Sequence, residues 1–155
     1  MSRRRILLQV GGVLVAMTAL AMLALPRSLS AVSTTVHVIE HATTDTVINT
    51  DGQGDTTGDL LTFHNPVFDA SNHKRVGHDQ GDCIRISPGQ GTWECRWTTF
   101  LPEGHLTVEG PFYDTKGSVL TVTGGTGKYV NAHGTMELRS RQGGKQFDFI
   151  FHLTG

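Results

Sequence analysis

Two cysteines and two tryptophans form the first group of residues whose spacing suggests chemistry. Residues 88–91 (Pro-Gly-Gln-Gly) predict a turn, and a hairpin closed by this turn places Cys83 directly opposite Cys95. Three further residues share the cysteine face or lie close to it: Arg85, Trp93 and Trp97. A face of this composition is more typical of a barrel interior that receives a ligand than of a purely aliphatic core.

Other kinds of site find little support in the sequence. Among eight histidines, His37 and His41 share a strand face, but no cysteine or carboxylate accompanies them at metal-ligand spacing. No nucleophile elbow is present. A phosphate loop needs a glycine five positions before Gly127, where this chain has a valine, and Ser or Thr after Lys128, where it has a tyrosine. We therefore expect no metal, no cofactor and no Ser-His-Asp triad.

The composition favours a turn-rich β domain that does not bind nucleic acid. The chain has 155 residues, of which 19 are glycine and 37% are hydrophobic, and no segment after residue 35 keeps a sustained helical apolar period. The net charge of −1 hides an asymmetry, because four of the 13 basic residues and none of the 14 acidic residues lie in the first 31 positions. The remainder is therefore acidic, which argues against a nucleic-acid partner.

Residues 1–31 have the features of a secretory leader. Three arginines at positions 3–5 precede an apolar run at 6–25, and small residues follow at 28–31. We expect a signal peptide over 1–31, with an uncleaved membrane anchor at 6–25 as the alternative. In both cases residues 32–155 form a domain that is secreted or held in the cell envelope. Export permits a disulfide between Cys83 and Cys95, and two buried free thiols are the alternative because cross-strand geometry often strains the bond.

The sequence after the leader predicts about eight short strands. Apolar alternation and turn signals predict strands at the following positions: one or two within 36–50, then 58–64, 76–87, 92–100, 105–110, 118–123, 135–141 and 145–153. Asn65 and Pro66 are expected to end the second of these, because proline cannot donate to a central ladder. One face of the last strand carries four core residues: Phe147, Phe149, Phe151 and Leu153. This pattern predicts an antiparallel barrel or sandwich.

Several motifs in register resemble the plant allene oxide cyclases. They are Gly-Asp-Leu-Leu-Thr-Phe at 58–63 with Asn-Pro-Val-Phe-Asp at 65–69, Gly-Asp-Cys-Ile-Arg-Ile at 81–86, the segment 104–112, and Leu-Thr-Val-Thr-Gly-Gly-Thr-Gly at 120–127. The segments 77–81 and 124–134 are also similar to dirigent proteins, which share that fold. The resemblance covers roughly residues 36–153. It implies an all-β, eight-stranded antiparallel up-and-down barrel, preceded here by a signal or anchor helix, and a homotrimer.

The resemblance also implies site residues. Glu40 matches an interior glutamate that acts electrostatically on delocalised charge, and Asn65 matches an asparagine that helps to hold a water at the epoxide oxygen. Cys83 matches a cysteine that lines the pocket. The remaining wall of the substrate-binding pocket would be formed by Leu61, Phe63, Trp93, Trp97 and Phe112.

Two departures from the family pattern bear on the substrate. Ala42 stands where the family has a second asparagine, and Phe112 stands where it has a tyrosine. We expect a cofactor-free cyclase or isomerase that controls the stereochemistry of a small hydrophobic reactive intermediate other than the plant one. A non-catalytic small-molecule-binding barrel, or an interaction module of the cell envelope, is the alternative. A cavity beside Glu40 of roughly 300 Å³ or more would favour the enzyme.

Overall fold

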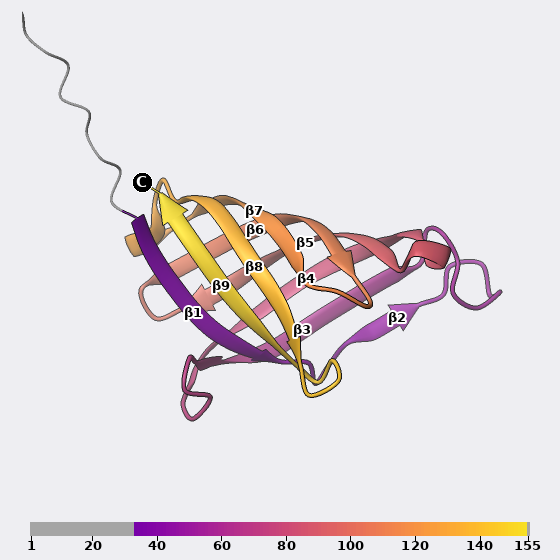
Figure 1. The fold of residues 1–155 in the computed structure, drawn as a ribbon, viewed down its shortest axis with the longest axis horizontal. Helices are drawn as coiled ribbons and strands as arrows, with labels where there is room; N and C mark the ends of the chain where they lie inside the picture. Colours follow the sequence, from indigo (N-terminus) through magenta and orange to yellow (C-terminus); the bar gives the residue numbers. More distant parts are fainter. Residues whose placement is uncertain (1–32, 155) are drawn as a thin grey trace, which may run out of the picture.

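The computed structural model describes residues 33–154, which form one antiparallel sheet closed on itself (Figure 1). The signal-peptide or anchor prediction for residues 1–31 lies outside this part of the chain. The strands are β1 Ser33–His41, β2 Thr46–Ile48, β3 Leu60–Asp69, β4 Arg75–Ser87, β5 Thr92–Leu101, β6 Gly104–Tyr113, β7 Ser118–Gly125, β8 His133–Arg141 and β9 Gln146–Thr154. Two short 3-10 helices interrupt the connections, η1 Pro88–Gln90 and η2 Gly127–Tyr129. Within 33–154 no helix has the length and apolar character needed to cross a membrane.

The strand order shows that the predicted eight-stranded antiparallel barrel is correct. Strands β3 to β8 each pair with the next strand in sequence, and β9 pairs with β1 along its whole length. The barrel closes where Val38–Glu40 of β1 pair with Val67–Asp69 of β3. The short β2 pairs only with the beginning of β3, so it lies beyond this closure as a ninth strand outside the ring (Figure 1).

The predicted break at Asn65 and Pro66 is wrong, because β3 runs through both residues to Asp69. On one side, β3 pairs with β2 up to Thr62 and with β1 only from Val67 onwards. Pro66 falls in the gap between these two pairings. The missing N–H of proline therefore costs no ladder hydrogen bond on that side, and the strand continues.

The hairpin register predicted for β4 and β5 is confirmed. Cys83 lies opposite Cys95 and Arg85 opposite Trp93. The two cysteines form a disulfide with a Cα–Cα distance of 4.0 Å, so the disulfide is the correct one of the two alternatives. This bond ties the two long strands together in the middle of the barrel wall.

The barrel interior is divided into a packed half and an open half. The packed half lies at the end that carries η2, and its fully buried side chains are Leu106, Leu120, Val122, Met136 and Phe151. The predicted core face of β9 is confirmed, since Phe149, Phe151 and Leu153 are buried and Phe147 is half-buried. The half at the C-terminal end of β1 and the N-terminal end of β9 retains a cavity.

A glycine on β4 allows the close approach of β4 and β5. A Cβ atom at Gly77 would lie 1.9 Å from the carbonyl oxygen of Phe100, which is backbone and cannot move aside. We expect Gly77→Ala to lower the free energy of unfolding by about 3 kcal/mol, the upper range for overpacking. Urea unfolding measures this. The matched control is Gly89→Ala in η1, where a Cβ meets no atom within 4 Å, and equal midpoints for the two variants would contradict the prediction.

Candidate functional site

The open half of the barrel contains a cavity of about 70 Å³. Six of the residues predicted from the sequence line it: Glu40, Leu61, Phe63, Cys83, Trp97 and Phe112. Its volume is well below the roughly 300 Å³ expected for a ligand-sized pocket. The cavity is therefore smaller than the enzyme prediction required, although it lies in the expected place beside Glu40.

The wall of this cavity is mainly aromatic. The Trp97 ring meets Phe63 edge-on at a centroid distance of 6.0 Å and Phe149 at 5.4 Å, which fixes the indole against the wall. Phe112 and Phe147 form a second edge-on pair at 6.0 Å and are only half-buried. A ligand larger than the cavity would have to displace these two half-buried rings.

Asn65 holds the polar side of the cavity together. Its Nδ2 group donates one hydrogen bond of 2.6 Å to Glu40 Oε1 and another of 2.7 Å to Asp45 Oδ1. Its Oδ1 accepts from the backbone N–H groups of Thr43 and Thr44, each at 2.9 Å, and from the Thr44 hydroxyl. An amide has only two N–H donors, so Asn65 has none left for a water or a substrate. In this arrangement Asn65 positions Glu40 and Asp45, and the water-holding role that the resemblance implied for Asn65 stays a prediction.

Burial controls the protonation of Glu40. The side chain is 5% exposed, and desolvation raises its pKa to about 7, opposed by the hydrogen bond from Asn65 and assisted by the charge of Asp45. A carboxyl group with this pKa can exchange a proton near neutral pH. The interior glutamate therefore has the acid–base properties of a catalytic group.

Asp79 is a member of this site that the sequence analysis missed. It is fully buried, its Oδ1 accepts a 3.2 Å hydrogen bond from the Asn65 backbone N–H, and no donor within 33–154 reaches its Oδ2. Desolvation and then the charge of Glu40 raise the pKa of Asp79 to about 9. A protonated Asp79 is therefore the stable form at neutral pH, and the two carboxyl groups titrate as a pair. Strand alternation could have revealed this residue in the sequence, because Asp79 lies on the same face of β4 as Cys83 and Arg85.

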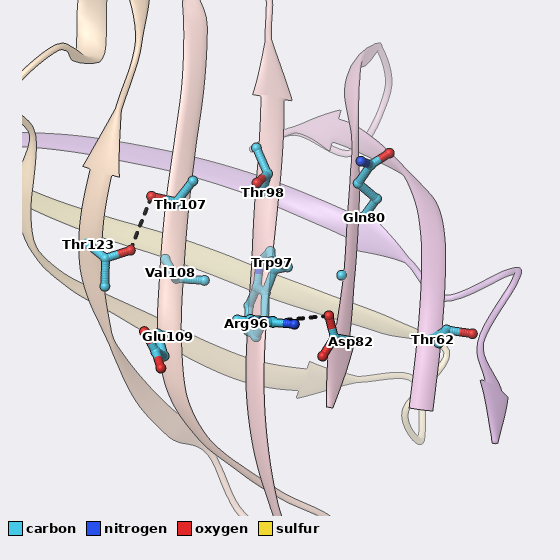
Figure 2. Close-up of a pocket in the computed structure, with 11 residues that line it drawn as sticks. Thr62, Gln80, Asp82, Arg96, Trp97, Thr98, Thr107, Val108, Glu109 and Thr123 are labelled. Carbon is cyan, nitrogen blue, oxygen red and sulfur yellow. Dashed lines mark hydrogen bonds and ion pairs between the residues drawn. The ribbon is translucent and has the colours of Figure 1, made fainter. Parts of the chain in front are cut away.

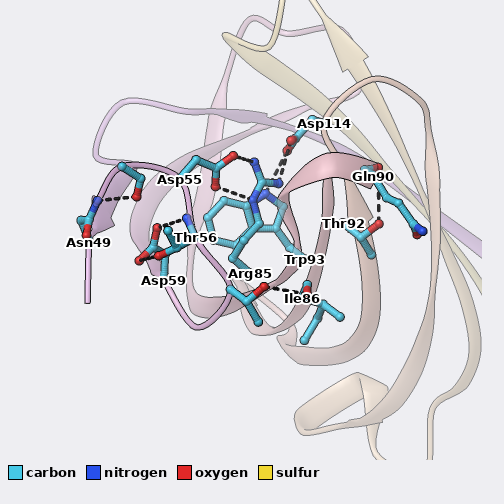
Figure 3. Close-up of polar contacts among 12 residues, drawn as sticks. Asn49, Asp55, Thr56, Asp59, Arg85, Ile86, Gln90, Thr92, Trp93 and Asp114 are labelled. Carbon is cyan, nitrogen blue, oxygen red and sulfur yellow. Dashed lines mark hydrogen bonds and ion pairs between the residues drawn. The ribbon is translucent and has the colours of Figure 1, made fainter. Parts of the chain in front are cut away.

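Trp93 was predicted as a wall residue, but it does not line the cavity. Its indole lies beneath the Arg85 guanidinium, 4.3 Å from the ring centroid, and donates a 2.9 Å hydrogen bond to Asp114 Oδ1 (Figure 3). Arg85 also donates to Asp114 Oδ2 at 2.7 Å and to Asp55 Oδ1 at 2.7 Å, and these contacts raise its pKa. This Arg85 cluster fixes two loops to the end of the β4–β5 hairpin. Trp93 therefore packs within this cluster and not against the cavity.

A second depression lies on the outer surface of the barrel and has a volume of about 680 Å³ (Figure 2). Polar side chains from β3 to β7 border it, and two of its contacts are the Arg96–Asp82 ion pair and the hydrogen bond between Thr107 and Thr123. It is open to solvent along its length. It therefore lacks the enclosure and the apolar wall that would hold a hydrophobic ligand, which the smaller interior cavity has.

No group of three or more His, Cys, Asp or Glu side chains within residues 33–154 is arranged to hold a metal ion. The polar groups of the cavity are carboxyl groups held by an amide and by each other. Such a site can place a charge, or donate and accept a proton, next to an apolar ligand.

The fold and the cavity define an antiparallel up-and-down barrel with a carboxyl group in its apolar interior. The sequence model of the family described as allene oxide cyclase matches residues 35–155, and the chain belongs to this family. The fold is similar to that of a pyocyanin demethylase, with a TM-score of 0.65 and 20% identity over 76% of this chain and 100% of that one.

Two further solved structures share the fold. One is the pterocarpan synthase dirigent protein GePTS1, with a TM-score of 0.63 and 17% identity over 79% of this chain and 88% of that one. The other is AbnU, an exo-specific intermolecular Diels-Alderase, with a TM-score of 0.60 and 16% identity over 80% of this chain and 99% of that one. At these identities the likeness shows the fold.

Proposed function

We propose that the protein is a cofactor-free cyclase or isomerase that binds a small hydrophobic reactive intermediate in the barrel and controls its stereochemistry. The observation that carries this proposal is Glu40, a buried carboxyl group fixed by Asn65 at the wall of an aromatic cavity. The aromatic wall would restrict the conformers of the intermediate and exclude water. Glu40 would stabilise positive charge that develops during the rearrangement. The leader-like residues 1–31 support an exported enzyme.

The substrate of this reaction differs from that of the plant enzymes. Phe112 lines the cavity without a hydroxyl group, and the amide of Asn65 is fully used within the protein. A bound water needs about two to four polar partners, and this wall offers fewer than the family pattern does. The volume of about 70 Å³ further favours a compact ligand, or one that displaces Phe112 and Phe147.

A two-stage experiment tests the proposal. The purified protein is incubated with cell extract and recovered, and native mass spectrometry identifies the retained compound and any product. With that compound as substrate, Glu40→Gln is expected to lower the rate by about 100-fold and to erode product stereochemistry, as loss of an electrostatic stabiliser of the transition state does. Glu94→Gln, an equal change on the exposed face of β5, should react like the wild type. An unchanged rate and an unchanged product stereochemistry in Glu40→Gln would contradict the proposal that the protein is an enzyme of this kind.

A second candidate is a barrel that binds a small molecule without converting it. The small cavity volume and the loss of polar groups at Ala42 and Phe112 favour this candidate. It predicts that the retained compound leaves the protein chemically unchanged. If the wild type converts the compound and Glu40→Gln does not, the non-catalytic barrel is excluded.

A further inference from the structure

The ionisable side chains that line the cavity are all acidic. Glu40 and Asp45 line it, and no Lys or Arg is among the lining residues. Asp79 accepts a hydrogen bond from the Asn65 backbone and, with its raised pKa of about 9, is uncharged at neutral pH. Asp45 is exposed at the rim, whereas Glu40 and Asp79 are buried. A ligand that enters the cavity therefore meets carboxyl groups from the rim to the interior.

Two donor groups near the cavity, the Asn65 amide and the Arg85 guanidinium, are already committed. Asn65 gives both of its amide hydrogens to Glu40 and Asp45. The buried guanidinium of Arg85 is held by two carboxylates, Asp55 and Asp114, and lies over Trp93 away from the cavity. A carboxylate placed beside Glu40 and Asp45 would thus meet acidic side chains, and neither Asn65 nor Arg85 could donate a hydrogen bond to it.

We propose that the ligand of this cavity is an apolar molecule that presents a protonated amine to Glu40 and Asp45, and that the cavity excludes carboxylates. This inference rests on the proposed function only in using the same cavity for ligand binding, and it does not require catalysis. The proposed specificity for an amine is opposite in charge to a specificity for fatty acids, which carry a carboxylate. An ammonium group supplies the hydrogen-bond donors that the carboxyl oxygens lack and offsets their mutual repulsion.

The geometry also sets a pH dependence for the ammonium ligand. The groups that face Glu40 are Asn65 and Asp79 from β3 and β4 and Asp45 from the loop after β1. When Glu40 is protonated, only Asp45 attracts the cation strongly. Ammonium binding therefore becomes tighter as the pH rises through the titration of Glu40, whereas binding of a neutral ligand changes little.

Three probes of equal chain length test this specificity: n-hexylamine, 1-hexanol and hexanoate. The chain has two tryptophans, so a nitrogen-15 spectrum shows two indole signals. The Trp97 signal reports the cavity, and the Trp93 signal in the Arg85 cluster is an internal control. At pH 8 we expect hexylamine to shift the Trp97 signal with a Kd at least about tenfold below that of hexanoate. Glu40→Gln should reduce the difference in Kd between hexylamine and hexanoate, and Glu94→Gln should leave this difference unchanged.

The outcomes separate this inference from the proposed function. Binding of hexanoate that equals or exceeds binding of hexylamine overturns the amine specificity and leaves the cavity as a ligand site. A hexylamine preference that survives in Glu40→Gln, or that appears only at the Trp93 signal, also overturns it. If none of the three probes moves the Trp97 signal, the cavity does not take apolar ligands, and the proposed function fails.

Discussion

Replacing Asp79 by Asn is expected to abolish a loss of stability that the wild-type protein undergoes between pH 7 and pH 9. Burial raises the pKa of Asp79 from its ordinary value to about 9, so the folded state keeps a proton that the unfolded chain releases at acidic pH. A group with a raised folded pKa stabilises the protein fully below its unfolded pKa and loses this contribution as the pH rises to the folded value.

The size of this loss follows from the same linkage. Each pH unit between the unfolded and the folded pKa removes about 1.4 kcal/mol per group. The pair releases one proton near pH 7 and the other near pH 9, so above pH 7 one proton remains to be lost, and it exists only while position 79 carries a carboxyl group. The wild type should therefore lose about 3 kcal/mol between pH 7 and pH 9, whereas Asp79→Asn should stay level because an amide does not titrate in this range.

Urea unfolding at several pH values between 7 and 9 measures both proteins. Asn at position 79 keeps an oxygen that accepts the hydrogen bond from the Asn65 backbone, so the fold is preserved. The control is Asp82→Asn on the same strand, where the carboxylate pairs with the exposed Arg96. Asp82→Asn should decline in parallel with the wild type. A parallel decline in Asp79→Asn would show that Asp79 is ionised throughout this pH range.

Reduction of the disulfide is expected to lower the free energy of unfolding by about 3 kcal/mol. Cys83 and Cys95 are 12 residues apart, and the entropy of closing a loop of this length in the unfolded chain corresponds to about that energy. The chain has only two cysteines, so a reductant acts on this bond alone. Both sulfur atoms are buried in the barrel, and reduction therefore has to be carried out in urea before refolding.

Urea midpoints of the oxidised and the reduced protein give the energy difference. The double variant Cys83→Ala, Cys95→Ala serves as the control, because its midpoint should not respond to the reductant. If the midpoint of the wild type is also insensitive, the two strands are held by their ladder alone. The Trp97 indole signal should broaden on reduction, since both cysteines belong to the same cavity wall.

The parts of the structure that could be predicted depend on local patterns. The register of β4 and β5 follows from one turn, and it correctly placed Cys83 opposite Cys95. The continuation of β3 through Pro66 depends on where β1 and β2 end on its other side, which no local pattern contains. The cavity volume likewise depends on how side chains from several strands meet.

The site residues illustrate the same limit. Asp79 was missed because a charged residue in a strand normally faces solvent, and only the closed barrel turns this one inward. Trp93 was predicted to line the pocket because the resemblance places it in the wall and because it shares the face of the two cysteines. Its partner Asp114, which draws the indole aside, comes from the loop after β6. Asn65 was predicted as a polar residue of the site, and its hydrogen bonds to Glu40 and Asp45 could be counted only in the structure.

The division of the interior into a packed half and an open half has a consequence for the evolution of this barrel. The core around Leu106, Leu120, Met136 and Phe151 stabilises the barrel without taking part in the cavity. Leu61, Phe63 and Phe112 are only half-buried and pack against the edge of the core, so substitutions there reshape the cavity while the fully buried side chains stay in place. New specificities can accumulate at one end of the molecule while selection for folding acts mainly at the other.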